Sequence, residues 1–245
     1  MLYEIGKWDC NLNREENMDP LISIIMPTYN RAKYIEKALD SIKRQTFKDY
    51  EIIVVDDGST DNTKEIVEQY EEIRYIYQDH GGISKARNTA IRAAKGKWIA
   101  TLDSDDLWKK DKLQKQVDYL EAHPDCRIVY TAFQNFTDIP EEKLNERQIN
   151  LLQTADKCYL PSALIDARLF DEVGLYDETK EWGEDTDWIF RLIIFKVDMK
   201  HYIDEVLYLR RIHSLNISIT TKGVSNLDIW KMSAAAYRNT KRVKK

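Results

Sequence analysis

Residues 51–59 have the sequence Glu-Ile-Ile-Val-Val-Asp-Asp-Gly-Ser, an apolar run that stops at two acidic residues and a glycine. Four consecutive β-branched residues without polar alternation indicate a strand buried on both faces. The Asp-Asp-Gly-Ser that follows favours a turn. This pattern decides the fold, because similar apolar runs that end in polar residues cover residues 21–26, 74–77 and 97–102.

Stretches with helical periodicity separate these four predicted strands. The clearest has Ile35, Ala38, Leu39 and Ile42 on one side and predicts a helix from about residue 31 to 45. Two further helices are predicted, one around residues 66–70 and one from Gly81-Gly82 to residue 93. Buried strands alternating with helices predict an α/β fold, with a mostly parallel, Rossmann-like sheet and helices on both faces.

The regular alternation ends after residue 106. The patterns predict helices at 113–122 and 184–195, strands at 127–133 and 203–211, and a charged loop at 138–150. We therefore expect an extension at 1–20, a first half at 21–106, a mixed second half of the same domain at 107–221, and a tail at 222–245. The tail has seven basic residues against one acidic residue, with apolar residues interleaved. It predicts a basic amphipathic helix that either packs on the domain or contacts a membrane peripherally.

Composition excludes several classes of protein. Among 245 residues, 37 are basic and 42 acidic, so the net charge of −5 argues against a general nucleic-acid binder. No apolar stretch is long enough to span a membrane, and the N-terminus lacks the pattern of an export signal. The three cysteines are widely spaced, which favours a reducing cytoplasm over a disulfide framework.

Polar residues follow all four strands, at the edge where parallel sheets bind ligands. They are Pro27-Thr28-Tyr29-Asn30, Asp56-Asp57-Gly58-Ser59, residues 78–82 and Asp103-Ser104-Asp105-Asp106. Two neighbouring carboxylates repel each other, and Mg²⁺ or Mn²⁺ relieves that repulsion with oxygen ligands. Asp is equally common in turns, so this cluster alone leaves both interpretations open. The chain lacks a dinucleotide-binding fingerprint and a P-loop.

These segments resemble those of the family-2 glycosyltransferases, inverting enzymes with a GT-A fold that use nucleotide-sugar donors. The resemblance covers about residues 22–218. It rests on residues 27–31, 54–59, 82–88 and 103–106 and on Glu184-Asp185, in that order. It implies that residues 21–106 bind the nucleotide sugar and that residues 107–221 bind the acceptor and carry the catalytic group.

The resemblance also implies individual roles. Thr28 and Tyr29 would line the nucleobase pocket beside Pro27 and Ser104, and Asp57 would accept a hydrogen bond from the base. Lys85 or Arg87 would approach the base or the diphosphate. Asp103 would hold the ribose or the metal. Asp105 would bind the metal directly, His213 would complete the metal site or contact the diphosphate, and Arg211 would neutralise phosphate charge. For Asp56 we expect only a turn role. His80, His123 and His201 match no motif.

In that family the Asp of the Glu-Asp pair is the general base, which here is Asp185. We expect a helix to begin near this pair, and its positive end to keep the carboxylate ionised near neutral pH. Glu184 and Trp182 would orient the acceptor or the loop, Trp182 by offering a flat face to a sugar, whereas Trp188 is expected in the core.

The expected enzyme is therefore a metal-dependent inverting hexosyl- or N-acetylhexosaminyltransferase. Its donor would be a nucleoside diphosphate sugar, with UDP the expected nucleotide. Its acceptor would be a bacterial glycan or lipid-linked hydroxyl in polysaccharide or cell-surface glycan synthesis. Two alternatives remain: a non-catalytic nucleotide- or glycan-binding scaffold, and an Asp-x-Asp phosphohydrolase. Leu107 replaces the Thr or Val of the phosphohydrolase pattern.

Overall fold

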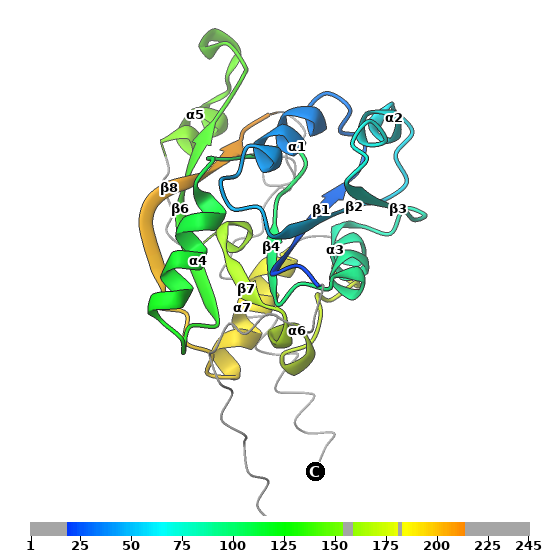
Figure 1. Cartoon of the computed structure of the whole chain (residues 1–245). Helices are drawn as coiled ribbons and strands as arrows, with labels where there is room; N and C mark the ends of the chain where they lie inside the picture. The colour runs from blue at the N-terminus through cyan, green and yellow to red at the C-terminus, as the bar shows by residue number, and fades with distance from the viewer. Residues whose placement is uncertain (1–18, 154–158, 181–182, 214–245) are drawn as a thin grey trace, which may run out of the picture.

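The computed structural model describes residues 19–153, 159–180 and 183–213. In these residues one eight-stranded sheet has the order β3-β2-β1-β4-β7-β6-β8-β5 (Figure 1). The strands are β1 (Ile22–Thr28), β2 (Tyr50–Asp56), β3 (Ile73–Tyr77), β4 (Trp98–Thr101), β5 (Leu107–Trp108), β6 (Ile128–Phe136), β7 (Leu164–Asp166) and β8 (Tyr202–Arg211). The predicted α/β fold is confirmed.

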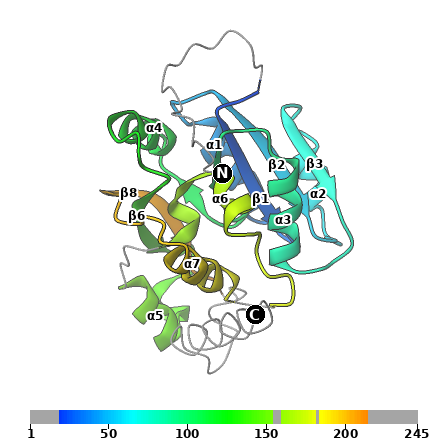
Figure 2. The ribbon, with the colours of Figure 1, turned by 90° about the horizontal axis from the view of Figure 1, so that it is seen from below.

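The first four strands are parallel, as predicted. Their side chains alternate between two cores: Ile24 of β1 packs on one face and Ile25 on the other. The first core contains residues of α1 (Ile35–Lys43), α2 (Thr63–Val67) and α4 (Lys112–Ala122), and the second contains residues of α3 (Ile83–Ala93), α6 (Arg168–Glu172) and α7 (Glu184–Ile194). Figure 1 shows α1 and α2 on the opposite side of β1 and β2 from α3, and Figure 2 shows α3, α6 and α7 from below.

The second half of the sheet is mixed, as expected for residues beyond 106. Strand β7 runs antiparallel to both β4 and β6, β8 runs parallel to β6, and β5 runs antiparallel to β8. Strands β5 and β7 were not predicted from the sequence. Two or three residues are too few to show a period, so only tertiary pairing defines these strands.

Some predicted boundaries were wrong. Helix α1 begins at Ile35 rather than near residue 31, because Asn30 has a φ of 52° and residues 32–34 form a turn before the helix. The charged segment 138–150 is not simply a loop: α5 (Glu146–Leu152) begins inside it. The cause is a capping box, in which Asn145 and Gln148 each bond the other's backbone N–H.

The parallel register brings the polar strand ends together. Thr28 pairs with Asp56, and Asp56 pairs with Tyr77, so β1, β2 and β3 end at the same level. Strand β4 pairs with β1 up to Thr101, which places Asp103 beside the end of β1. This edge of the sheet is the position from which the site is built.

Within the described residues, every helix is too short or too polar to cross a bilayer. The expected N-terminal extension, apart from residues 19 and 20, and the basic tail at 222–245 lie outside the described residues. The expected division of the domain stays a prediction.

Candidate active site at the carboxyl edge of the sheet

Asp57 holds the loop at residues 78–82 in place. Its buried carboxylate accepts hydrogen bonds from the backbone N–H groups of Gly81 and Gly82, at 2.9 and 2.8 Å, and from the side-chain amide of Gln78, at 2.6 Å. Gly82 has a φ of 90° and directly precedes α3, so the predicted helix begins after a turn that favours glycine. Asp57, expected to contact a base, is therefore already a strong acceptor for this loop. Any contact with a base would add to these bonds.

Thr28 and Tyr29 lie at the end of β1 as predicted. Tyr29 is 40% exposed, whereas the Thr28 hydroxyl is buried and has no hydrogen-bond partner among the described residues. A buried hydroxyl without a partner is costly, so a ligand that bonds it would be favoured. Asp56 has the turn role expected for it, since its Oδ1 accepts the Ser59 amide at 2.7 Å.

Arg87 is the centre of the site. Its side chain is 2% exposed, and it donates to three carboxylates: Nη1 to Glu184 at 2.8 Å and to Asp185 at 2.7 Å, and Nη2 to Asp103 at 3.0 Å. Asp103 follows β4, while Glu184 and Asp185 begin α7, so one guanidinium joins the two halves of the domain. The predicted contact of Arg87 with base or diphosphate stays a prediction.

The surroundings of Asp185 change its acidity. Burial, together with the neighbouring charges of Glu184 and Asp103, raises the pKa of Asp185 to about 7, although Arg87 opposes this shift. The N-terminus of α7 was expected to keep Asp185 ionised near neutral pH, whereas burial beside two carboxylates raises its pKa into that range. A carboxylate with this pKa is a stronger base than an ordinary aspartate, and a pKa near the working pH suits a general base.

Asp105, in the acidic segment 103–106, lies in contact with His213. His213 Nε2 lies 2.9 Å from Asp105 Oδ2, and Arg31 Nε donates to the same oxygen at 3.2 Å. Burial raises the pKa of Asp105, but the His213 hydrogen bond and the Arg31 charge outweigh it and hold that pKa below its usual value. Asp105 therefore carries a negative charge at neutral pH.

This pair fits part of a metal site. A carboxylate and an imidazole that converge are suitable ligands for Mn²⁺, and such ions commonly take further oxygens from water and phosphate. Among the described residues, no group of three or more potential ligands is placed to hold a metal ion. Of the three predicted ligands, Asp105 and His213 come together, while Asp103 turns to Arg87 and accepts the Tyr159 hydroxyl at 3.4 Å.

Arg211 is 1% exposed, and it is enclosed by aromatic rings rather than open to a ligand. Its guanidinium lies over the rings of Tyr34 and Phe136, donates to the Asp105 carbonyl at 2.8 Å and pairs with Asp138. These contacts give Arg211 a supporting role beneath Asp105. The predicted diphosphate contact stays a prediction.

The other predicted residues are also placed. Pro27 is buried in β1, Ser104 is buried between the acidic residues, and Lys85 lies half-buried on the first turn of α3. Trp188 is in the core, stacked on Phe170 with ring centroids 4.6 Å apart, as expected. Trp182 lies outside the described residues.

His80 was missed by the sequence analysis. Its ring stacks on Tyr29 with centroids 4.3 Å apart, and its Nδ1 lies 2.8 Å from Asp57 Oδ2. Arg31, the last residue of the segment 27–31, had no predicted role of its own, yet it pairs with Asp105. The only local sequence signal for His80 and Arg31 is that each lies shortly after a predicted strand. Their contacts cannot be found from local sequence, because the partner residues are distant along the chain.

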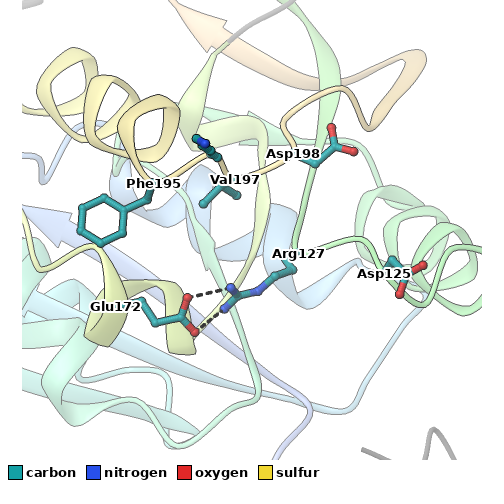
Figure 3. Close-up of a pocket in the computed structure, with 7 residues that line it drawn as sticks. Asp125, Arg127, Glu172, Phe195, Val197 and Asp198 are labelled. Carbon is teal, nitrogen blue, oxygen red and sulfur yellow. Dashed lines mark hydrogen bonds and ion pairs between the residues drawn. The ribbon is translucent and has the colours of Figure 1, made fainter. Parts of the chain in front are cut away.

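A pocket of about 260 Å³ lies elsewhere (Figure 3). Arg127 in this pocket donates to both oxygens of Glu172, at 2.7 and 2.9 Å, and also to Asp166. Asp166 pairs with Trp98, the first residue of β4, whereas Asp103 follows the last. The pocket is thus at the amino end of β4, away from the acidic cluster, and we do not include it in the site.

Comparison with known proteins identifies the relatives of this chain. Residues 23–173 match the sequence profile described as glycosyl transferase family 2. The uncharacterized glycosyltransferase RP339 of Rickettsia prowazekii is 35% identical over 218 residues, 82% of this chain and 67% of the relative. The putative teichuronic acid biosynthesis glycosyltransferase TuaG of Bacillus subtilis is 42% identical over 122 residues, 48% of either chain.

Solved structures of S. aureus TarS are similar in fold. TarS 1-349 in complex with UDP has a TM-score of 0.61 and 25% identity, covering 78% of this chain and 60% of TarS 1-349. The complex with UDP-GlcNAc has a TM-score of 0.70 and 24% identity, covering 87% and 65%. The chain spans about half to two thirds of the length of these relatives.

The position of Arg87 predicts a large stability cost for its removal. Arg87→Met leaves three partly buried carboxylates without their shared cation, and breaking buried ion pairs costs about 3–5 kcal/mol. We expect about 3 kcal/mol, since Asp103 and Asp185 are partly exposed. Arg92→Met on the same helix removes an exposed pair with Glu178 and should cost under about 1 kcal/mol. Urea unfolding measures both, and equal costs would contradict the account.

Proposed function

We propose a reaction for this chain on one premise: it belongs to glycosyl transferase family 2, and its enzyme class is therefore glycosyltransferase. The proposed reaction transfers a sugar, with inversion, from a nucleoside diphosphate sugar to an acceptor hydroxyl. One observation carries it: Arg87 binds both Asp103, at the donor end of the sheet, and Asp185, the expected base. A donor held at the strand ends would then have its anomeric carbon close to the base.

The donor would bind across the ends of β1, β2 and β4. Tyr29, which is 40% exposed and stacked on His80, provides an aromatic ring for a base, and the buried Thr28 hydroxyl beside it lacks a partner among the described residues. The UDP named in a TarS complex supports UDP as the nucleotide, because that structure shares the fold at 25% identity. A UDP-hexose or UDP-N-acetylhexosamine is the proposed donor.

Asp185 would act as the general base. As the acceptor oxygen forms its bond to the anomeric carbon, Asp185 takes the hydroxyl proton, and the bond to the diphosphate breaks on the opposite face of the sugar. This single displacement inverts the anomeric centre. Asp185 is 27% exposed, so an acceptor can reach it, and Arg87 fixes the direction of its carboxylate.

Asp105 and His213 would hold Mn²⁺ or Mg²⁺, with phosphate oxygens and water as the other ligands. When bound, the ion would neutralise charge on the leaving diphosphate. The chain itself supports this position from below: Arg211 bonds the Asp105 carbonyl, and Tyr34 stacks on His213 with centroids 4.9 Å apart. Asp103, held by its ion pair with Arg87, would face the ribose or the sugar of the donor.

The acceptor would lie on the side of the second half. TuaG is named as a putative glycosyltransferase of teichuronic acid biosynthesis, which supports a cell-surface glycan as the acceptor class. A groove of about 310 Å³ with an apolar lining (Ile139, Leu144, Ile149 and Leu152 among others) lies within residues 137–153. It adjoins the metal side, because Thr137 Oγ1 donates to the Ile212 carbonyl next to His213. We propose that these residues select the acceptor.

The two carboxylates of the Glu-Asp pair can be separated by substitution. Asp185→Asn keeps the shape but cannot accept the proton, so transfer should fall about 10²–10⁴-fold while UDP affinity barely changes. Glu184→Gln should reduce transfer less, because Glu184 is 10% exposed and supports Arg87 rather than facing the acceptor. Steady-state transfer and calorimetry with UDP measure the two properties.

The reversed result, in which Asp185→Asn keeps turnover and Glu184→Gln loses it, would move the base to Glu184. If the purified chain binds UDP but releases none from any UDP-sugar, with or without acceptor, the chain would be a binding scaffold and not a transferase.

The metal proposal has its own test. Asp105→Ala should abolish the part of UDP affinity that depends on Mn²⁺, because it removes the carboxylate that His213 faces. Asp204→Ala is the control, since Asp204 is exposed on β8. Calorimetry with UDP, with and without Mn²⁺, gives the comparison. An unchanged Mn²⁺ effect in Asp105→Ala would rule out Asp105 as the ligand.

A further inference from the structure

His80 lies against both groups that a nucleobase would use. Its imidazole stacks on Tyr29 with an angle of 26° between the ring planes, and Nδ1 lies 2.8 Å from Asp57 Oδ2. An imidazole is a flat heterocycle with an N–H donor. Nδ1 also lies within hydrogen-bond distance, 3.0 Å, of the Asp57 main-chain carbonyl. The ring therefore makes the two kinds of contact, stacking and a polar contact with Asp57, that a pyrimidine base would make here.

The space is too small for His80 and a base together. Aromatic rings in contact have centroids about 4.5–7 Å apart, so no third ring fits between two whose centroids are 4.3 Å apart. Because one imidazole touches both Tyr29 and Asp57, the ring face it covers is the face nearest Asp57. A base that contacts both groups must take that place.

The backbone around His80 is fixed by several hydrogen bonds, whereas its exposed ring is held by its contacts with Tyr29 and Asp57. Asp57 binds Gln78, Gly81 and Gly82 on either side of it. Gly58, with a φ of +86°, packs so closely against the His80 backbone that a Cβ on Gly58 would lie 3.0 Å from the His80 backbone nitrogen. The His80 side chain is 58% exposed, so it can leave Tyr29 by rotation about its own bonds with little loss of buried surface.

We propose that His80 is a gate on the nucleobase site: its ring covers Tyr29 and Asp57 in the unliganded enzyme and swings outward when the donor base binds. This inference rests on the proposed function. The gate reduces donor affinity, since the base must displace an existing stacking contact and a hydrogen bond. It also selects for a base that can replace both contacts.

Substitution of His80 tests the gate, with UDP as the probe and the full chain as the protein. His80→Ala uncovers the ring and the carboxylate, so UDP should bind about three- to tenfold more tightly, the gain expected from removing one competing contact. Pyrophosphate, which has no base, should bind equally to both proteins. His123→Ala is the matched control: His123 is exposed and stacks on Tyr119 with centroids 4.0 Å apart, away from the site.

A second measurement follows the His80 ring directly in the wild-type chain. In an NMR titration of the wild-type chain with UDP, the His80 ring protons should lose the ring-current shift caused by Tyr29, and those of His123 should not move. The His80 signals are identified by their absence from the spectrum of His80→Ala.

The outcomes separate the gate from the function. Weaker or unchanged UDP binding by His80→Ala, with UDP still bound by the wild type, overturns the gate alone and indicates that His80 helps hold the base or does not touch it. Failure of both proteins to bind UDP overturns the proposed donor, and with it the gate.

Discussion

The site depends on the buried positive charge of Arg87. The Arg87 guanidinium, on α3, contacts one carboxylate at the end of β4 and two at the start of α7, and these lie 16, 97 and 98 residues from it in the chain. Burial, together with the negative charges of Glu184 and Asp103, raises the pKa of Asp185, although Arg87 opposes the shift. The same contacts fix Asp185 relative to the strand ends.

The two halves of the domain contribute different parts of this site. The parallel half supplies the Tyr29 ring, the Asp57 loop and the acidic segment after β4, all brought to one level by strand register. The mixed half supplies Asp185 from α7 and His213 from the end of β8. Arg87 and the Asp105–His213 contact link these two halves.

Much of this could be predicted from the sequence because it depends on local patterns. The buried parallel strands and the longer helices follow from hydrophobic periodicity, and the rule that ligands bind at strand ends leads to Tyr29, Asp57, Asp103 and Asp105. The short elements β5, β7 and α6 could not be found this way, since a few residues have no measurable period. Helix α5 had a local signal, its capping box, that the charged composition of the segment obscured.

The contacts of individual side chains could not be predicted from the sequence, because they depend on the tertiary structure. No pattern near Arg87 indicates that it turns inward to Glu184 and Asp185, and none near Arg211 indicates that aromatic rings enclose it. The acidity of Asp185 was misjudged for the same reason. A helix N-terminus is visible in the sequence, but the burial and the neighbouring carboxylates that outweigh it are not.

The pH dependence of kcat/KM for sugar transfer tests the central claim most directly, since it reports the free enzyme. With the Asp185 pKa raised to about 7 by burial and its carboxylate neighbours, the base is protonated below that pH. The account predicts a rate that is constant above about pH 8 and falls tenfold per pH unit below about pH 7. A rate that stays constant from pH 8 down to pH 5 would show an ordinary aspartate and contradict the account.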